Sequence, residues 1–192
     1  MENASLNSLR DRIPPQDKRF VTFQYTLHLM SARKVRTIVE TGTARDGECN
    51  CAGDGCSTPI WGQWAKQNGA YVYSVDIDPE AVRCSSAACT PYLDHMTFVA
   101  SDSVTFLENF NKPIDFLYLD SYDFDLDDPL PSQEHHLKEI IAAYPWLHAK
   151  SIIMIDDCAL PFGGKGRLVI EYLLDRGWKI ALSYYQIILT YE

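Results

Sequence analysis

Three aspartates stand at the ends of two apolar segments, where their side chains could do chemistry. Asp120 follows the run FLYL, and Asp156 with Asp157 follows the run IIMI. Neighbouring parallel strands lie about 4.8 Å apart, so these carboxylates would converge at one edge of a sheet. Grouped carboxylate oxygens suit Mg²⁺, and a bound Mg²⁺ lowers the pKa of a hydroxyl that it holds. The sequence therefore predicts a magnesium ion at these three aspartates.

A purely structural role is the alternative for the same acids. Strand-end aspartates often cap helices or bind loop amides. Consecutive side chains of a regular strand also point to opposite faces, which would separate Asp156 from Asp157. Both interpretations stay open.

A hydroxyl activated at this edge needs a proton acceptor. Asp120 itself is a candidate, and Asp123 follows three residues later. His135 and His136 open the helical segment after the acidic loop, and an imidazole can accept a proton near neutral pH. Each histidine could instead be an ordinary polar residue on a helix surface. The sequence predicts these candidates without choosing among them.

Polar residues also follow the first three apolar segments, at VETGT, SVDIDPE and ASDS. In doubly wound sheets, ligands bind outside the carboxyl ends of the strands, where glycine lets the backbone approach closely. A carboxylate after the second strand can accept hydrogen bonds from a ribose. Together the segments offer the groups that an adenosyl ligand with an amino-acid tail would use. The candidates are Glu40, Gly42, Thr43, Asp76, Ile77, Asp102 and Ser103.

A nicotinamide cofactor site and a turn without a ligand are two other interpretations of these segments. A dinucleotide site would need G-x-G-x-x-G, with an acidic residue about 20 positions later. Here four residues separate Gly42 from Gly47, and Asp76 comes 34 positions after Gly42. The sequence therefore does not predict a nicotinamide cofactor. The first loop could also be a tight turn without a ligand, and Asp78, before Pro79, is expected to cap the next helix.

The segment ECNCAGDGCSTPIWG lengthens the connection after the first strand. Its three cysteines have no obvious fourth partner, whereas structural zinc takes four ligands. We therefore expect no zinc there. Because the start of the chain does not resemble a signal peptide, we expect all six cysteines as thiols. Ser57 or Thr58 is expected to cap a helix that begins at Pro59.

The elements that carry these residues form a doubly wound pattern. Runs such as FLYL are apolar on both faces, as in parallel strands covered by helices on both sides. The final segment WKIALSYYQIILTYE holds two strand-like runs with no room for a helix between them. The sequence predicts an α/β fold with a mostly parallel seven-stranded sheet and an antiparallel C-terminal strand. One domain, residues 1–192, would include an N-terminal helix over about residues 17–34.

The segments expected in this sheet can be given by residue range. The strands are Thr37–Glu40, Tyr71–Asp76, Met96–Ala100, Ile114–Asp120 and Ser151–Asp156, followed by the two C-terminal runs. The helices between them are about Pro59–Gln67, Pro79–Thr90, Ser103–Asn109, Gln133–Leu147 and Lys165–Arg176.

Charge and hydropathy limit the partners. The 192 residues carry a formal net charge of −9 and no cluster of Lys and Arg, which disfavours a nucleic-acid substrate. No apolar run approaches the roughly 20 residues that a membrane helix needs. The sequence predicts a cytoplasmic protein that acts on a small molecule, binds neither nucleic acid nor membrane, and could form a homo-oligomer.

The order of VETGT, SVDIDPE, ASDS, DFLYLDSYD and IIMIDD over residues 37–157 resembles class I S-adenosylmethionine-dependent methyltransferases, which have a Rossmann-like fold. The resemblance implies that Glu40 and Gly42 hold the methionine tail of S-adenosylmethionine. It also implies that Asp76 binds the ribose.

The same resemblance implies that Asp102 and Ser103 meet the adenine. The pattern GDG-x-ST is similar to small bacterial-type methyltransferases in which this segment helps to wall the cofactor pocket. Asp54 and Ser57 are therefore secondary cofactor candidates.

The acids of the fourth and fifth strands resemble those of catechol-type and macrocin-type O-methyltransferases. In those enzymes, one acid after strand four and two adjacent polar residues after strand five bind the metal. Asp120, Asp156 and Asp157 match these positions. No lysine can be placed near Asp120 from the sequence, although the catechol enzymes use one as a base.

The function implied is metal-assisted O-methylation of a small molecule by S-adenosylmethionine, with Asp120 beside both the cofactor and the metal. A metal-independent N- or C-methyltransferase is an alternative, since methyl transfer needs mainly alignment of the reacting groups. A non-catalytic domain that binds S-adenosylmethionine is another.

Overall fold

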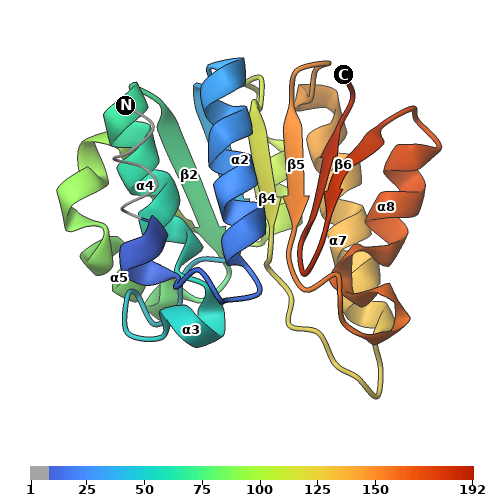
Figure 1. Ribbon diagram of the computed structural model, residues 1–192, viewed down its shortest axis with the longest axis horizontal. Coiled ribbons are helices and arrows are strands. Elements are labelled where there is room, and N and C mark those ends of the chain that lie inside the picture. Colours follow the sequence, from blue (N-terminus) through green and yellow to red (C-terminus); the bar gives the residue numbers. More distant parts are fainter. Residues whose placement is uncertain (1–8) are drawn as a thin grey trace.

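A seven-stranded sheet forms the centre of the protein, and the computed structural model describes residues 9–192 around it (Figure 1). The strand order is β3-β2-β1-β4-β5-β7-β6. β7 pairs antiparallel with both β5 and β6, and the other described pairs of neighbouring strands are parallel. The predicted fold class is thereby confirmed. The strands are β1 (Thr37–Thr41), β2 (Tyr71–Asp76), β3 (Met96–Ala100), β4 (Phe116–Leu119), β5 (Ile152–Ile155), β6 (Lys179–Ser183) and β7 (Ile187–Thr190).

Helices cover both faces of the sheet, and each predicted helix has a counterpart (Figure 1). As predicted, Asp78 caps α5, because its Oδ1 accepts the N–H of Glu80 over 2.9 Å. The helices are α2 (Phe20–Arg33), α3 (Cys51–Asp54), α4 (Ser57–Asn68), α5 (Pro79–Ala88), α6 (Ser103–Glu108), α7 (Leu130–Ala143) and α8 (Arg167–Leu174). Three short 3₁₀ segments are η1 (Thr90–His95), η2 (Tyr144–Trp146) and η3 (Pro161–Gly166).

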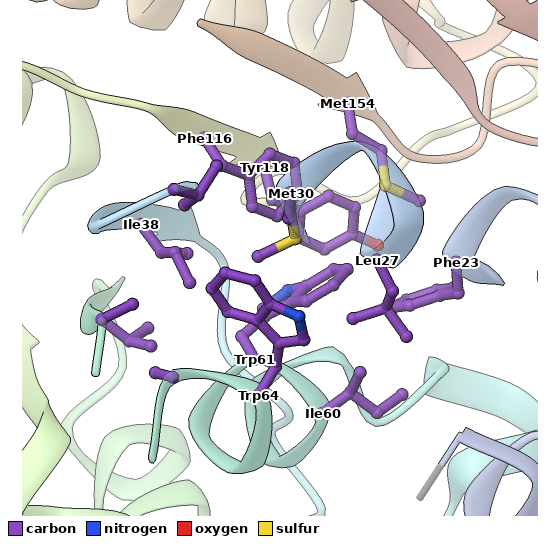
Figure 2. Close-up of a cluster of buried hydrophobic side chains, with 14 of the residues drawn as sticks. Phe23, Leu27, Met30, Ile38, Ile60, Trp61, Trp64, Phe116, Tyr118 and Met154 are labelled. Carbon is purple, nitrogen blue, oxygen red and sulfur yellow. The ribbon is translucent and has the colours of Figure 1, made fainter. Parts of the chain in front are cut away.

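Large aromatic side chains fill the space between α2, α4 and one face of the sheet (Figure 2). The Trp61 ring stacks on Phe23, with centroids 4.9 Å apart, and meets the edge of Phe116 at the same distance. The alternate residues of β4, Leu117 and Leu119, pack in a second cluster with α6, α7 and α8. Because β4 is buried on both faces, its carboxyl end is held rigidly.

Two cysteines of the insertion after β1 are not the free thiols that were predicted. Cys51 and Cys56 form a disulfide, while Cys49 is exposed and free. The turn of α3 and the left-handed Gly55 (φ 85°) bring the two Cα atoms to 4.7 Å, a separation that a disulfide can bridge. The prediction of six thiols, which rested on compartment alone, is therefore wrong for this pair.

None of the helices in residues 9–192 is both long enough and apolar enough to span a lipid bilayer.

Candidate functional site

Glu40 lies at the carboxyl end of β1 with its side chain fully buried. Ser57 Oγ donates to its carboxylate over 2.5 Å, and Thr58 Oγ1 and Ser74 Oγ each donate over 2.7 Å. The predicted capping role of Ser57 and Thr58 is wrong, because their hydroxyls turn inward to Glu40 and α4 begins at Ser57 itself. Glu40 thus ties β1, β2 and α4 together below the predicted cofactor loop.

Burial raises the pKa of Glu40 to about 7, even though three hydroxyls favour its ionised form. Between pH 4.5 and about 7, Glu40 therefore keeps its proton in the folded protein but loses it in the unfolded chain. Stability from this group is full below pH 4.5 and is lost as the pH rises through about 7. We expect the free energy of unfolding of the ligand-free protein to fall by about 2 kcal/mol from this source between roughly pH 5 and 7.

The variant Glu40→Gln cannot ionise, so we expect it to lack this part of the pH dependence. Urea unfolding at pH 5 and pH 7 measures the difference. The control is Glu134→Gln on the exposed face of α7, which should keep the wild-type pH dependence. Equal pH dependence in wild type and Glu40→Gln would contradict the assignment.

The loop after β1 passes close to the ends of β2 and β4. Gly42 has a φ of 78°, and a Cβ at this position would overlap the backbone carbonyl of Asp120. The next residue, Thr43, donates its N–H to Asp76 Oδ2 over 3.0 Å. Glycine is therefore required at position 42, and the loop is held between the two acids predicted to meet cofactor and acceptor.

Asp76 ends β2, and both of its carboxylate oxygens accept backbone hydrogen bonds. Thr43 N–H binds one oxygen, and Asp78 N–H binds the other over 2.9 Å. Each carboxylate oxygen has a second lone pair, so a diol could still bind. The backbone thus fixes the orientation of this carboxylate before a ligand arrives.

A cavity of about 270 Å³ opens beside Asp76. Asp102 caps α6 by accepting the N–H of Thr105 over 2.8 Å, which lowers the pKa of Asp102. Four of the predicted cofactor residues therefore share one hollow, which Glu40, Gly42, Thr43 and Ser57 do not line. The lining residues are Asp76, Ile77, Asp102 and Ser103, with Val75, Ser121, Tyr122 and His135.

The two histidines predicted as catalytic candidates have different surroundings. His135 lines the cavity, its Nε2 lies 3.1 Å from Ser103 Oγ, and the buried Glu139 raises its pKa. His136 is fully buried, with Nδ1 2.7 Å from the carbonyl of Ser132, and burial lowers its pKa to about 4. Unlike His135, His136 does not line the cavity and has no exposed surface, so the structure does not favour the catalytic role predicted for it.

The three aspartates of the predicted metal site do converge. One carboxylate oxygen from each of Asp120, Asp156 and Asp157 lies within 4.8 Å of the others. Asp157 lies beyond the end of β5 and has a φ of 51°. Its side chain therefore turns to the same side as that of Asp156. The alternation expected of a regular strand therefore does not separate this pair.

Two cations from the chain itself lie in this cluster. Lys165 is 2% exposed, and its Nζ lies 2.6 Å from Asp120 Oδ1 and 3.3 Å from Asp157 Oδ2. Arg19 Nε lies 3.4 Å from Asp156 Oδ2. Three carboxylates with an ammonium and a guanidinium among them are largely neutralised. As these side chains stand, they do not fit a resident divalent ion.

Lys165 and Arg19 were not predicted as site residues from the sequence. The signal for Lys165 was the glycine-rich segment GGKG shortly after the acid pair, since glycines let a loop approach a strand end closely. Nothing in the sequence marks Arg19, which precedes α2 and is 137 positions from Asp156. Tyr185 was also missed, and its hydroxyl donates to Asp157 Oδ1.

The remaining candidates lie at the edge of the site. Asp123 is largely exposed and forms a two-point ion pair with Arg45, over 2.7 and 3.0 Å. This pair joins the loop after β4 to the loop after β1. The side chain of Asp54 lies outside the described part of the structure.

A family model described as a methyltransferase domain matches residues 52–158, more than half of the 192 residues. Among curated proteins, no sequence matches the chain.

Solved structures resemble the chain in fold at low sequence identity. PaMTH1, an S-adenosylhomocysteine-bound methyltransferase from Podospora anserina, is 13% identical with a TM-score of 0.62, over 100% of this chain and 87% of that one. An rRNA methylase from Streptococcus thermophilus is also 13% identical, with a TM-score of 0.55, over 88% and 95% of the two chains.

MycE is a methyltransferase of mycinamycin biosynthesis, in complex with Mg, S-adenosylhomocysteine and mycinamycin VI. It is 15% identical, with a TM-score of 0.63, and the match covers 97% of this chain and 54% of MycE. This chain therefore spans about half the length of MycE.

Proposed function

The chain belongs to the methyltransferase domain family, and from this membership we propose that it methylates a hydroxyl group of a small molecule. It is a class I S-adenosylmethionine-dependent methyltransferase domain. The observation that carries the hydroxyl proposal is the position of Asp120. Its backbone meets the loop at Gly42, and its carboxylate meets the Lys165 ammonium at 2.6 Å.

The cofactor is proposed to lie along the ends of β1, β2 and β3. Asp76, its orientation fixed by backbone N–H groups, would accept hydrogen bonds from the ribose hydroxyls. Asp102 and Ser103 would face the adenine within the cavity of about 270 Å³. The methionine tail would follow the loop at Gly42, toward the end of β4. The methyl group would then lie beside Asp120.

Methylation of a hydroxyl releases one proton, which needs a base. We propose that the Asp120 carboxylate accepts this proton as the acceptor oxygen bonds to the methyl carbon. The carbon–sulfur bond breaks with its electron pair left on sulfur, which gives S-adenosylhomocysteine. An N–H of Lys165 can stabilise negative charge that develops on the acceptor oxygen. Burial raises the pKa of Asp120, which favours its role as a base.

Two other candidates for the base are less well placed. Asp123 is engaged by Arg45, which lowers the pKa of Asp123 and makes it a weaker base. His135 lines the cavity that we assign to adenosine, and it has Glu139 and Ser103 as partners.

The magnesium ion predicted from the sequence stays a prediction. The clustering of three carboxylates supports it, whereas Lys165 and Arg19 in the same cluster oppose it. No step of the proposed reaction depends on a metal.

Calorimetry and methyl transfer test this proposal. We expect the protein to bind S-adenosylhomocysteine with one site per chain. With S-adenosylmethionine labelled at the methyl group, we expect label in phenols or alcohols of an acceptor panel and none in matched amines. Transfer to amines or to carbon would favour the metal-independent N- or C-methyltransferase. Binding without transfer to any acceptor would favour a non-catalytic domain, and absence of binding would contradict the proposal altogether.

A further inference from the structure

A lysine ammonium occupies the space between the carboxylates of β4 and β5. The Nζ atom of Lys165 lies 2.6 Å from Asp120 Oδ1 and 3.3 Å from Asp157 Oδ2. Magnesium needs its oxygen ligands at about 2.0–2.1 Å in a nearly octahedral arrangement. An ion bound in that way by these two aspartates would have to displace the ammonium.

The backbone holds Lys165 in this place. Gly164 has a φ of 54°, and a Cβ there would overlap the carbonyl of Asp157. That carbonyl accepts the N–H of Lys165 over 3.3 Å. Gln133 on α7 donates its side-chain amide to the carbonyls of Phe162 and Gly164, over 3.1 and 2.9 Å. The side chain of Lys165 is only 2% exposed, so it cannot turn into solvent unless this loop opens.

A second cation completes the charge balance. Arg19 is 6% exposed and lies 3.4 Å from Asp156 and 3.8 Å from Asp157. Its guanidinium also lies over the ring of Tyr185, at 4.9 Å from the centroid. Tyr185 donates its hydroxyl to Asp157 Oδ1. Each carboxylate of the cluster is thus paired with a cation of the chain.

We propose that the Lys165 ammonium takes the place of a divalent cation between Asp120 and Asp157, so that the acceptor is bound without metal. An ammonium has three N–H donors, and the two aspartates engage two of them. One N–H remains for an acceptor oxygen. The position of the ammonium follows from the distances to Asp120 and Asp157. Its role in binding the acceptor rests on the proposed methyl transfer.

Titration with Mn²⁺, followed by electron paramagnetic resonance with and without S-adenosylhomocysteine, tests this proposal on the full chain. We expect wild type to leave Mn²⁺ free up to millimolar concentration. Lys165→Met keeps an unbranched side chain of similar volume and removes the ammonium group with its N–H donors. We expect it to bind one Mn²⁺ at least tenfold more tightly than wild type does, and Mn²⁺ to raise its Tm. Lys150→Met, at an exposed lysine, is the matched control and should behave as wild type does.

Two results would overturn the inference. One is stoichiometric Mn²⁺ binding by wild type that is lost in Asp157→Asn. The other is a folded Lys165→Met protein that binds no Mn²⁺, with folding judged by circular dichroism. If Lys165→Met does not fold, Mn²⁺ titrations of Lys165→Gln and of wild type test the inference in its place. A failure of the methyltransferase proposal appears separately, as absence of S-adenosylhomocysteine binding in wild type.

Discussion

Replacement of Asp76 by alanine is expected to weaken the binding of S-adenosylhomocysteine roughly 100- to 10,000-fold. Hydrogen bonds to a charged group contribute about 1.5–3 kcal/mol each, and the carboxylate would accept one from each ribose hydroxyl. The variant also removes the acceptor that orients the N–H of Thr43, so the loop after β1 loses a support. Calorimetry with S-adenosylhomocysteine measures the change.

Asp78→Ala is the matched control for this variant. Asp78 lies two residues away and caps α5 through Glu80 N–H, so its loss should cost about 1 kcal/mol of stability. Asp78 does not line the cavity. We therefore expect the affinity of the Asp78→Ala variant for S-adenosylhomocysteine to stay within threefold of the wild-type value. A folded Asp76→Ala protein with unchanged affinity would remove Asp76 from the proposed ribose site.

Trp61→Ala is expected to lower the free energy of unfolding by about 3–5 kcal/mol, because it removes a fully buried indole ring, the largest type of side chain in the described core. Trp61 touches Phe23, Phe116 and Tyr118, with ring centroids 4.9, 4.9 and 5.7 Å away. Its Nε1 has no hydrogen-bond partner in the described structure, so packing accounts for the loss. Guanidinium unfolding measures it.

Val21→Ala, on the exposed side of α2, is the control and should change stability by at most about 0.5 kcal/mol. The double variant Trp61→Ala with Phe23→Ala should show a coupling of about 0.5–1.5 kcal/mol, since the two rings stack. Independent effects of the two substitutions would mean that the stacked pair does not form.

The sequence alone predicts the sheet and the location of the site. Apolar runs such as FLYL and IIMI mark buried parallel strands, because only strands covered on both faces lack alternation. The ends of such strands lie at one edge of the sheet, so Asp76, Asp102 and Asp120 could be placed there before the structure was known. Short-range signals also predict the cap at Asp78, because a cap depends only on neighbouring residues.

The tertiary structure alone reveals which charges face that edge. Lys165 and Arg19 reach Asp120 and Asp156 across 45 and 137 positions of sequence, and no local pattern encodes a contact over such a separation. The left-handed backbone at Asp157 likewise turns its carboxylate toward the cluster against the alternation of a strand. The inward hydroxyls of Ser57 and Thr58 follow from the buried Glu40, because a carboxylate without water needs donors. The sequence therefore determines where the acids lie, and the fold decides what neutralises them.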